Sequence, residues 1–222
     1  YADHVESESI FIAVFKNLYD GISIDDLIKA LIMTAKTFIE KDPLYAKVTA
    51  QLLLYSIRKE VLGRDGQAGE AKETYKSYFP RFIEKGIEIG VLSSELKNFD
   101  LEFLSEVINP EKDLQFGYLG LQTLYDRYFL IDRSDKFSKE GRRIELPQIF
   151  FMRVAMGLAI REENRSEKAA EFYNLLSSFD FMSSTPTLFN SGTNFSQLSS
   201  CYLSTVEDDL DRIYEAIKEN AL

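Results

Sequence analysis

The chain has 222 residues, of which 45% are hydrophobic and 13% aromatic, so it can bury a core and is not a disordered tail. Its formal net charge of -10 disfavours nucleic-acid binding through a broad basic face. The single cysteine, Cys201, excludes a disulfide framework and favours a cytoplasmic location, and no apolar run is long enough to span a membrane.

Four helices are predicted in the first part of the chain. Apolar side chains at helical spacing indicate the first helix at 8–19. Ser23 is a suitable N-cap for the second. The third is predicted at 44–62 and the fourth at 70–88, where Pro80 is expected to break or kink the helix. The expected buried face of the second helix consists of Leu27, Leu31, Ala35 and Phe38.

The segment 64–69 has the composition of a loop, and the middle of the chain alternates short helices with turns. Residues 127–131 and 143–146 flank a charged turn and are expected to pair as a hairpin. Five further helices are predicted at 93–98, 101–107, 118–127, 147–158 and 167–179.

The composition changes after residue 179, where residues 183–200 are rich in Ser, Thr, Asn, Gly and Pro. A short strand is expected at 198–203 and an acidic helix at 209–221. Hydroxyls and free backbone N–H groups in such a segment suit a phosphate or a sugar, although an ordinary polar connection is the commoner explanation. A lone cysteine is likewise more often an inert core residue than a reactive one.

Outside this segment the residues give little indication of chemistry. His4 has no partner at ligand spacing, and the sequence contains no metal-binding cluster, phosphate-binding loop or dinucleotide-binding glycine pattern.

Two neighbouring motifs carry a resemblance to a known family. Residues 185–193 read TPTLFNSGT and residues 197–201 read QLSSC, and together they closely resemble the start of the catalytic barrel of class I ribonucleotide reductase large subunits. Further stretches resemble the same family upstream, at 18–21, 43–46, 117–124, 127–128, 145–148 and 152–155, and downstream, at 208–210 and 213–214.

The resemblance implies a mainly α fold followed by the beginning of a ten-stranded α/β barrel. It divides the chain into 1–63, similar to the end of an ATP-cone, 64–165, a helical N-terminal domain with a short hairpin, and 166–222, the start of the barrel. Because the chain begins at Tyr1, we expect it to be an excerpt or a processed form.

The implied reaction is the reduction of ribonucleoside diphosphates to 2′-deoxyribonucleotides by thiyl-radical chemistry, for the synthesis of DNA precursors. Cys201 matches the first cysteine of the family's redox pair, and Thr185 and Ser200 match positions that contact the substrate. The second redox cysteine, the radical-bearing cysteine and the catalytic Asn and Glu are expected beyond Leu222, so this fragment alone is expected to have no turnover.

Regulatory positions follow from the same resemblance. Asp208, Asp209 and Leu210 match the start of the specificity site, where a deoxynucleotide effector binds near the dimer interface. Lys59 matches a basic position of the ATP-cone. Ile24 and Ile28 stand where other members have polar residues, which leads to the hypothesis that this cone does not bind ATP.

No cofactor or metal is expected within the chain itself. The resemblance implies a metal-radical cofactor in a separate small subunit, ATP or dNTP effectors with Mg²⁺, a homodimer of large subunits, and thioredoxin or glutaredoxin as reductant. Two alternatives stay open: a cobalamin-dependent class II ribonucleotide reductase, and a non-catalytic helical interaction module.

Overall fold

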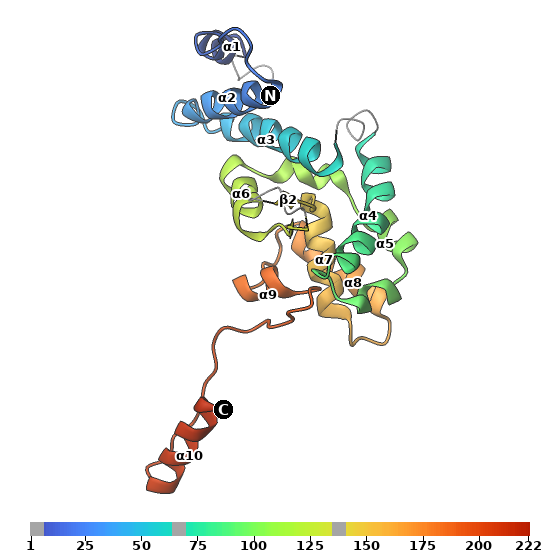
Figure 1. Ribbon diagram of the computed structural model, residues 1–222, viewed down its shortest axis with the longest axis vertical. Coiled ribbons are helices and arrows are strands. Elements are labelled where there is room, and N and C mark those ends of the chain that lie inside the picture. The colour runs from blue at the N-terminus through green and yellow to red at the C-terminus, as the bar shows by residue number, and fades with distance from the viewer. Residues whose placement is uncertain (1–6, 64–69, 135–140) are drawn as a thin grey trace.

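The computed structural model describes residues 7–63, 70–134 and 141–222 (Figure 1). The first half contains α1 (Ser7–Phe15), α2 (Ile24–Thr37), α3 (Tyr45–Leu62), α4 (Ala71–Glu88), the 3₁₀-helix η2 (Ser94–Asn98), α5 (Leu101–Val107) and the 3₁₀-helix η3 (Pro110–Gln115). The second half contains α6 (Tyr118–Thr123), the π-helical turn η4 (Leu124–Tyr128), β1 (Ile131–Asp132), β2 (Arg142–Arg143), α7 (Pro147–Ala159), α8 (Arg165–Ser177), α9 (Thr185–Asn190) and α10 (Leu210–Ala221).

The mainly helical fold predicted from the sequence is confirmed. Ser23 caps α2 by accepting a hydrogen bond from the Asp26 backbone N–H at 3.1 Å. The third helix ends before Gly63, whose φ of 77° lies in the left-handed region that favours glycine. His4 and the predicted loop at 64–69 lie outside the described residues.

Several predictions about the helices need correction. The first helix ends at Phe15 instead of residue 19, because Leu18 and Tyr19 are exposed and gain no packing from a further turn. In α2, Leu27 and Leu31 are only half-buried, while Ile28 and Ile32 are buried, because α2 packs against both α1 and α3.

Pro80 does not break α4. It lies with Lys76, one turn earlier, on a half-buried side of the helix, where water can satisfy the Lys76 carbonyl that the missing N–H leaves free. The predicted helix at 118–127 is α6 followed by η4, in which the Phe129 N–H donates to the Leu124 carbonyl five residues earlier.

The predicted hairpin is present but short. Ile131 pairs with Arg143 and Asp132 with Arg142 in an antiparallel register, and the Ile144 N–H donates to the Leu130 carbonyl. The strand predicted at 198–203 is not formed, because no other described strand pairs with its backbone in a ladder. The helical turns η3 and α9 were not predicted.

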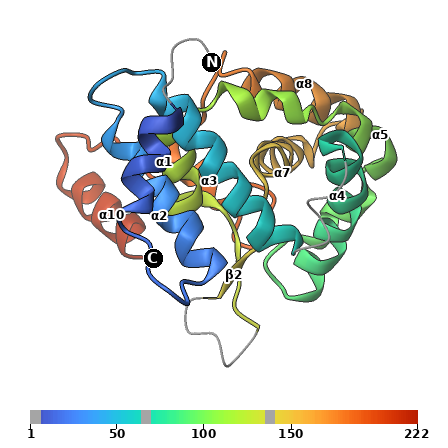
Figure 2. The ribbon, with the colours of Figure 1, turned by 90° about the horizontal axis from the view of Figure 1, so that it is seen from above.

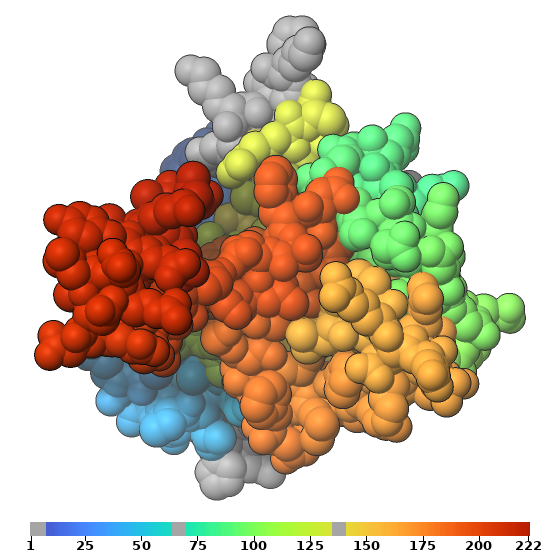
Figure 3. Space-filling model, turned by 90° about the horizontal axis from the view of Figure 1, so that it is seen from below, coloured from blue at the N-terminus to red at the C-terminus, as the bar shows by residue number. Residues whose placement is uncertain are grey.

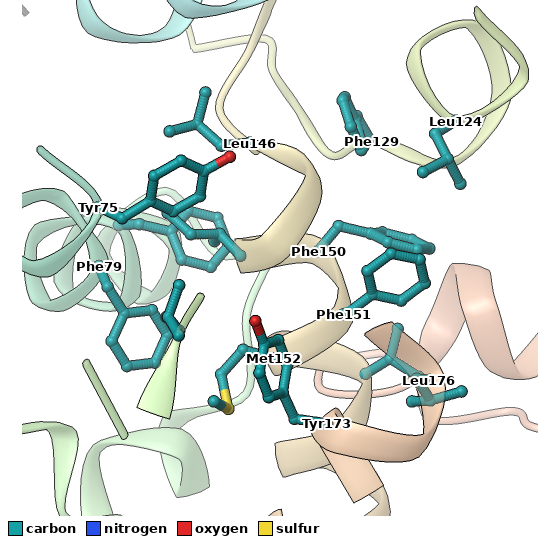
Figure 4. Close-up of a cluster of buried hydrophobic side chains, with 14 of the residues drawn as sticks. Tyr75, Phe79, Leu124, Phe129, Leu146, Phe150, Phe151, Met152, Tyr173 and Leu176 are labelled. Atoms are coloured by element: carbon teal, nitrogen blue, oxygen red, sulfur yellow. The ribbon is translucent and has the colours of Figure 1, made fainter. Parts of the chain in front are cut away.

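Helix α7 is the centre of the fold. Seen end-on in Figure 2, it is surrounded by α3, α4, α5 and α8. Eleven of its 13 residues are buried, so it is enclosed on nearly every side. Figure 4 shows Phe150 and Phe151 of α7 pointing one way and Tyr75 and Phe79 of α4 packed on the other side. Each fully buried aromatic side chain contributes roughly 1.5–3 kcal/mol of hydrophobic stabilisation.

A buried polar network joins the helices around α7. The Asp113 carboxylate accepts hydrogen bonds from the Tyr75 hydroxyl at 2.7 Å, the Arg58 guanidinium at 3.0 Å and the Gln148 amide at 2.9 Å. Gln148 in turn accepts from the Tyr173 hydroxyl at 3.0 Å. Burial raises the pKa of Asp113, against the opposing effect of these three donors. The network therefore fixes α3, α4, α7 and α8 relative to one another.

The two ends of the chain lie apart from this core. Ile10, Val14, Ala35, Phe38 and Tyr45 form a separate small cluster between α1, α2 and α3. Helix α10 stands away from the rest of the molecule at the end of an extended segment (Figure 1). The domain divisions at 63 and 165 and the start of a barrel stay predictions. Among the described residues no helix combines the length and apolarity needed to cross a bilayer.

The hairpin generates a prediction about pH. A hydrogen bond from Lys85, with two more from Ser134, lowers the pKa of Asp132 to about 2. A carboxyl whose pKa is lowered on folding stabilises the protein above its unfolded pKa of about 3.9, and this contribution is lost as pH falls towards 2. We expect Asp132→Asn to cost about 1–2 kcal/mol at pH 7 and roughly half as much at pH 3, measured by urea unfolding of this chain. An equal cost at both pH values would contradict the prediction.

Candidate functional site

The candidate site is the polar segment 183–201, which occupies the middle of the lower face of the molecule (Figure 3). It runs through α9 and turns at Ser191 and Gly192. It then returns to Cys201 without regular secondary structure. Gly192 has a φ of 77°, which a glycine adopts without strain.

A buried ion pair holds α9 against the core. The Arg153 guanidinium and the Glu145 carboxylate are both fully buried, with Arg153 Nε 2.6 Å from Glu145 Oε1. Arg153 also donates to the carbonyls of Ser191 at 2.7 Å and Leu188 at 3.3 Å. These carbonyls lie at the C-terminal end of α9, where a positive charge is favourable. Glu145 Oε2 accepts from the Leu130 N–H at 2.8 Å, so the pair also holds the chain after η4.

The backbone of the segment touches the backbone of α7. A Cβ atom built on Gly157 would lie 2.0 Å from the Gly192 nitrogen and 2.3 Å from Ser191 Oγ. The Ser191 hydroxyl donates to the Val154 carbonyl at 2.7 Å. Only a glycine at 157 permits this approach.

Side chains within the segment fold its two arms together. Thr187 Oγ1 donates to the Leu198 carbonyl at 3.2 Å, and Asn190 Nδ2 donates to the Gln197 carbonyl at 2.6 Å. Thr193 forms an isolated antiparallel bridge with Leu92. The arms that carry Thr185 and Ser200 are therefore joined by side chains of one arm that donate to backbone carbonyls of the other.

The predicted site residues Thr185, Ser200 and Cys201 all lie at the surface. Ser200 Oγ is 3.8 Å from Cys201 Sγ, and Cys201 is a free, exposed thiol. Thr185 Oγ1 lies 3.3 Å from the hydroxyl of Tyr128, which comes from η4. The thiol is accessible to a reactant and is not enclosed in apolar packing.

Clefts lie beside the segment and elsewhere. A cleft of about 410 Å³ is lined by Gly157, Arg161, Leu198 and residues 191–194, without Thr185, Ser200 or Cys201 among its lining residues. A larger cleft of about 700 Å³, lined partly by Arg58, Lys72 and Glu106, contains none of the residues predicted for a site.

The predicted effector residues lie at the start of α10, which stands away from the rest of the molecule (Figure 1). Asp209 is the N-cap of α10, where its carboxylate accepts from the Asp211 N–H at 3.1 Å and the Arg212 N–H at 3.2 Å. Asp208 and Leu210 are exposed beside it. The structure therefore gives Asp209 a capping role, and the effector assignment stays a prediction.

The predicted ATP-cone position Lys59 has a partner within the chain. Its Nζ lies 2.5 Å from Asp25 Oδ1 at the start of α2. Ile24 is exposed and Ile28 is buried against the core. Neither isoleucine side chain offers a hydrogen bond to a nucleotide.

Sequence reasoning missed four residues that shape the site: Tyr128, Glu145, Arg153 and Gly157. A signal for Arg153 was available, because it is the only charged residue in the apolar run 147–160. A charge in such a run requires a buried partner. No comparable signal marked Tyr128, whose contact joins residues 57 positions apart. Among the described residues no group of His, Cys, Asp or Glu is arranged to hold a metal ion.

Comparison with known proteins gives consistent matches. Residues 114–196 match the family described as "Ribonucleotide reductase, all-alpha domain". The chain is 50% identical over 209 residues to the ribonucleoside-diphosphate reductase subunit alpha of Chlamydia muridarum, covering 94% of this chain and 19% of that protein. It is 48% identical to the Chlamydia pneumoniae subunit over 98% of this chain and 20% of that protein. It is 41% identical to the Helicobacter pylori subunit over 91% of this chain and 24% of that protein. The chain thus spans about a fifth of the length of the chlamydial relatives.

The buried pair generates a prediction about stability. Arg153→Met leaves the Glu145 carboxylate buried without its cation and should destabilise this chain by about 3–5 kcal/mol. Glu145→Gln combined with Arg153→Met should recover part of this loss. Urea unfolding measures both, with Lys168→Ala, which removes only an exposed pair with Glu171, as a control expected to cost under about 1 kcal/mol. A loss below about 1 kcal/mol for Arg153→Met would show that the pair does not hold the segment.

The close approach at Gly157 generates another prediction. Gly157→Ala places a methyl group against the backbone of Gly192 and should cost about 1–3 kcal/mol despite alanine's higher helix propensity. Gly120→Ala in α6 is a matched control, since its nearest contact is a Phe116 side-chain atom at 3.8 Å, and it should be neutral or stabilising. Thermal unfolding of both variants decides the matter; similar melting temperatures would count against the close packing.

Proposed function

Because the chain belongs to the ribonucleoside-diphosphate reductase large-subunit family, we propose that the whole protein reduces ribonucleoside diphosphates to 2′-deoxyribonucleoside diphosphates. The observation that carries the proposal is the exposed Cys201 thiol beside Ser200, at the end of a segment held rigidly by buried contacts. A reducing thiol has to reach the sugar, and an exposed thiol next to hydroxyl groups meets that requirement.

The proposed reaction is a two-electron reduction at the ribose. A thiyl radical on one cysteine takes the 3′ hydrogen, the 2′ hydroxyl leaves as water, and hydrogen from a thiol replaces it. Two further cysteines supply the two electrons and become a disulfide, and the first cysteine returns the 3′ hydrogen. Cys201 is proposed as one thiol of this pair. Since it is the only cysteine among the 222 residues, the other thiols have to come from outside this sequence.

Thr185 and Ser200 are proposed to bind the nucleotide. Their hydroxyls donate and accept hydrogen bonds without adding charge, which suits a sugar or a phosphate oxygen in a protein with a net charge of -10. Both lie on the arms of the segment that Arg153 and Gly157 position.

The proposed partners follow from the family. The relatives are named as the alpha subunit of the reductase, which supports a separate small subunit, and we propose that this subunit supplies the radical from its own metal cofactor. We further propose thioredoxin or glutaredoxin as reductant, a homodimer, and ATP or dNTP effectors with Mg²⁺. Asp208, Asp209 and Leu210 are proposed to begin the effector site.

The test uses the full-length subunit with a small subunit, a dithiol reductant and a ribonucleoside diphosphate. Cys201→Ser should abolish formation of deoxynucleotide, because a hydroxyl cannot form the disulfide. Ser204→Ala, at an exposed position three residues away, is the control and should keep activity.

Two results would favour the alternatives. Activity that needs adenosylcobalamin and no small subunit would identify the class II enzyme. A Cys201→Ser protein as active as the wild type would favour a non-catalytic module. The same holds if neither the wild type nor Cys201→Ser forms deoxynucleotide with the small subunit or with adenosylcobalamin.

A further inference from the structure

The hydroxyl of Tyr128 lies beside the proposed nucleotide-binding residue Thr185, with 3.3 Å between the two oxygen atoms. Tyr128 ends the π-helical turn η4, and Thr185 begins α9. No feature of the reaction described above requires a tyrosine at this place.

Tyr128 is held firmly on both its ring and its backbone. Its ring centroid lies 4.6 Å from that of Phe189 and 6.3 Å from that of Phe150. The chain after it is fixed by the Phe129 N–H on the Leu124 carbonyl at 3.0 Å and the Leu130 N–H on Glu145 at 2.8 Å. Tyr128 is half-buried, so the ring is packed while its hydroxyl lies at the surface with Thr185.

The Glu145–Arg153 pair is the common anchor of both hydroxyls. Glu145 binds the chain that follows Tyr128, and Arg153 binds the end of α9, whose first residue is Thr185. Neither Tyr128 nor Thr185 has to move for their two hydroxyl oxygen atoms to bind one ligand together. A pair of groups fixed in advance loses little conformational entropy when a ligand binds.

The separation of 3.3 Å suits a shared ligand better than a direct bond. Two hydroxyls that bond directly lie about 2.7–2.8 Å apart. Two oxygen atoms at the observed separation can both lie at that bonding distance from one third oxygen atom. A phosphate oxygen is a suitable third atom, because it accepts hydrogen bonds from both hydroxyls at once.

We propose that Tyr128 is a further binding residue of the nucleotide site, beside Thr185 and Ser200, and that it donates with Thr185 to one phosphate oxygen of the nucleoside diphosphate. The inference rests on the proposed function for the identity of the ligand. It assigns Tyr128 a role in binding and none in the radical steps.

The test is a double-mutant cycle in the full-length subunit with its small subunit. The variants are Tyr128→Phe, Thr185→Val and the two together, with KM, kcat and direct binding of a ribonucleoside diphosphate as readouts. Each single variant should raise KM and the dissociation constant roughly 3- to 10-fold, with kcat nearly unchanged. The double variant should differ from the product of the single effects, since groups that share a partner are coupled.

Tyr125→Phe is the matched control. It removes a hydroxyl from the same turn, but that hydroxyl donates to Glu60 of α3 at 2.7 Å. We expect its KM to stay at the wild-type value and its effect to multiply with that of Thr185→Val.

The possible outcomes separate the inference from the proposed function. If the wild type binds the nucleotide but reduces none, the proposed function fails, while a cycle with coupled losses of binding still supports Tyr128. The inference is overturned if the wild type binds no nucleoside diphosphate or Tyr128→Phe binds it normally. It is also overturned if Tyr128→Phe acts only on kcat or the two effects multiply.

Discussion

The buried pair of Glu145 and Arg153 is the constraint on which the rest of the candidate site depends. An ion pair removed from water is stable only when its remaining donors and acceptors are also satisfied. Here those bonds go to three backbone groups in two elements: Leu130 in the chain after η4, and Leu188 and Ser191 at the end of α9. The electrostatic requirement of one buried cation thereby determines where two surface elements lie, although neither element has an apolar core of its own.

The central helix α7 combines this role with a second one. Gln148 lies on α7 five residues before Arg153. It belongs to the separate network around Asp113, which joins α7 to α3, α4 and α8. The two buried polar groups of α7 thus face different neighbours, the helical body and the candidate site. Because α7 is buried on nearly all sides and a close-packed interior deforms little, the helix fixes the candidate site relative to the helical body.

Local signals predicted most of the helices and almost none of the site geometry. Local signals act on the nearest turn of chain, so their effect can be predicted without knowing the fold. Examples are the cap at Ser23, the glycine at 63 and the proline at 147. Other elements depend on the chain that lies beside them. Arg153 binds the end of α9, whereas residues 198–203 have no described strand to pair with and do not form a strand. The motif at 185–201 identified the family, but the residues that hold the motif in place are distant in sequence.

The π-helical turn at Leu124–Tyr128 has a consequence for how this protein tolerates insertions and deletions. A wide turn contains one residue more than the α-helix it interrupts. Because each residue advances a helix by about 100°, removing one residue there would rotate the side chains that follow it in this turn, up to Tyr128, to another direction. Phe129 would occupy the direction that Tyr128 has now after a deletion, and Arg127 would occupy it after an insertion. The length of this turn is therefore as specific a requirement as the identity of the tyrosine that ends it.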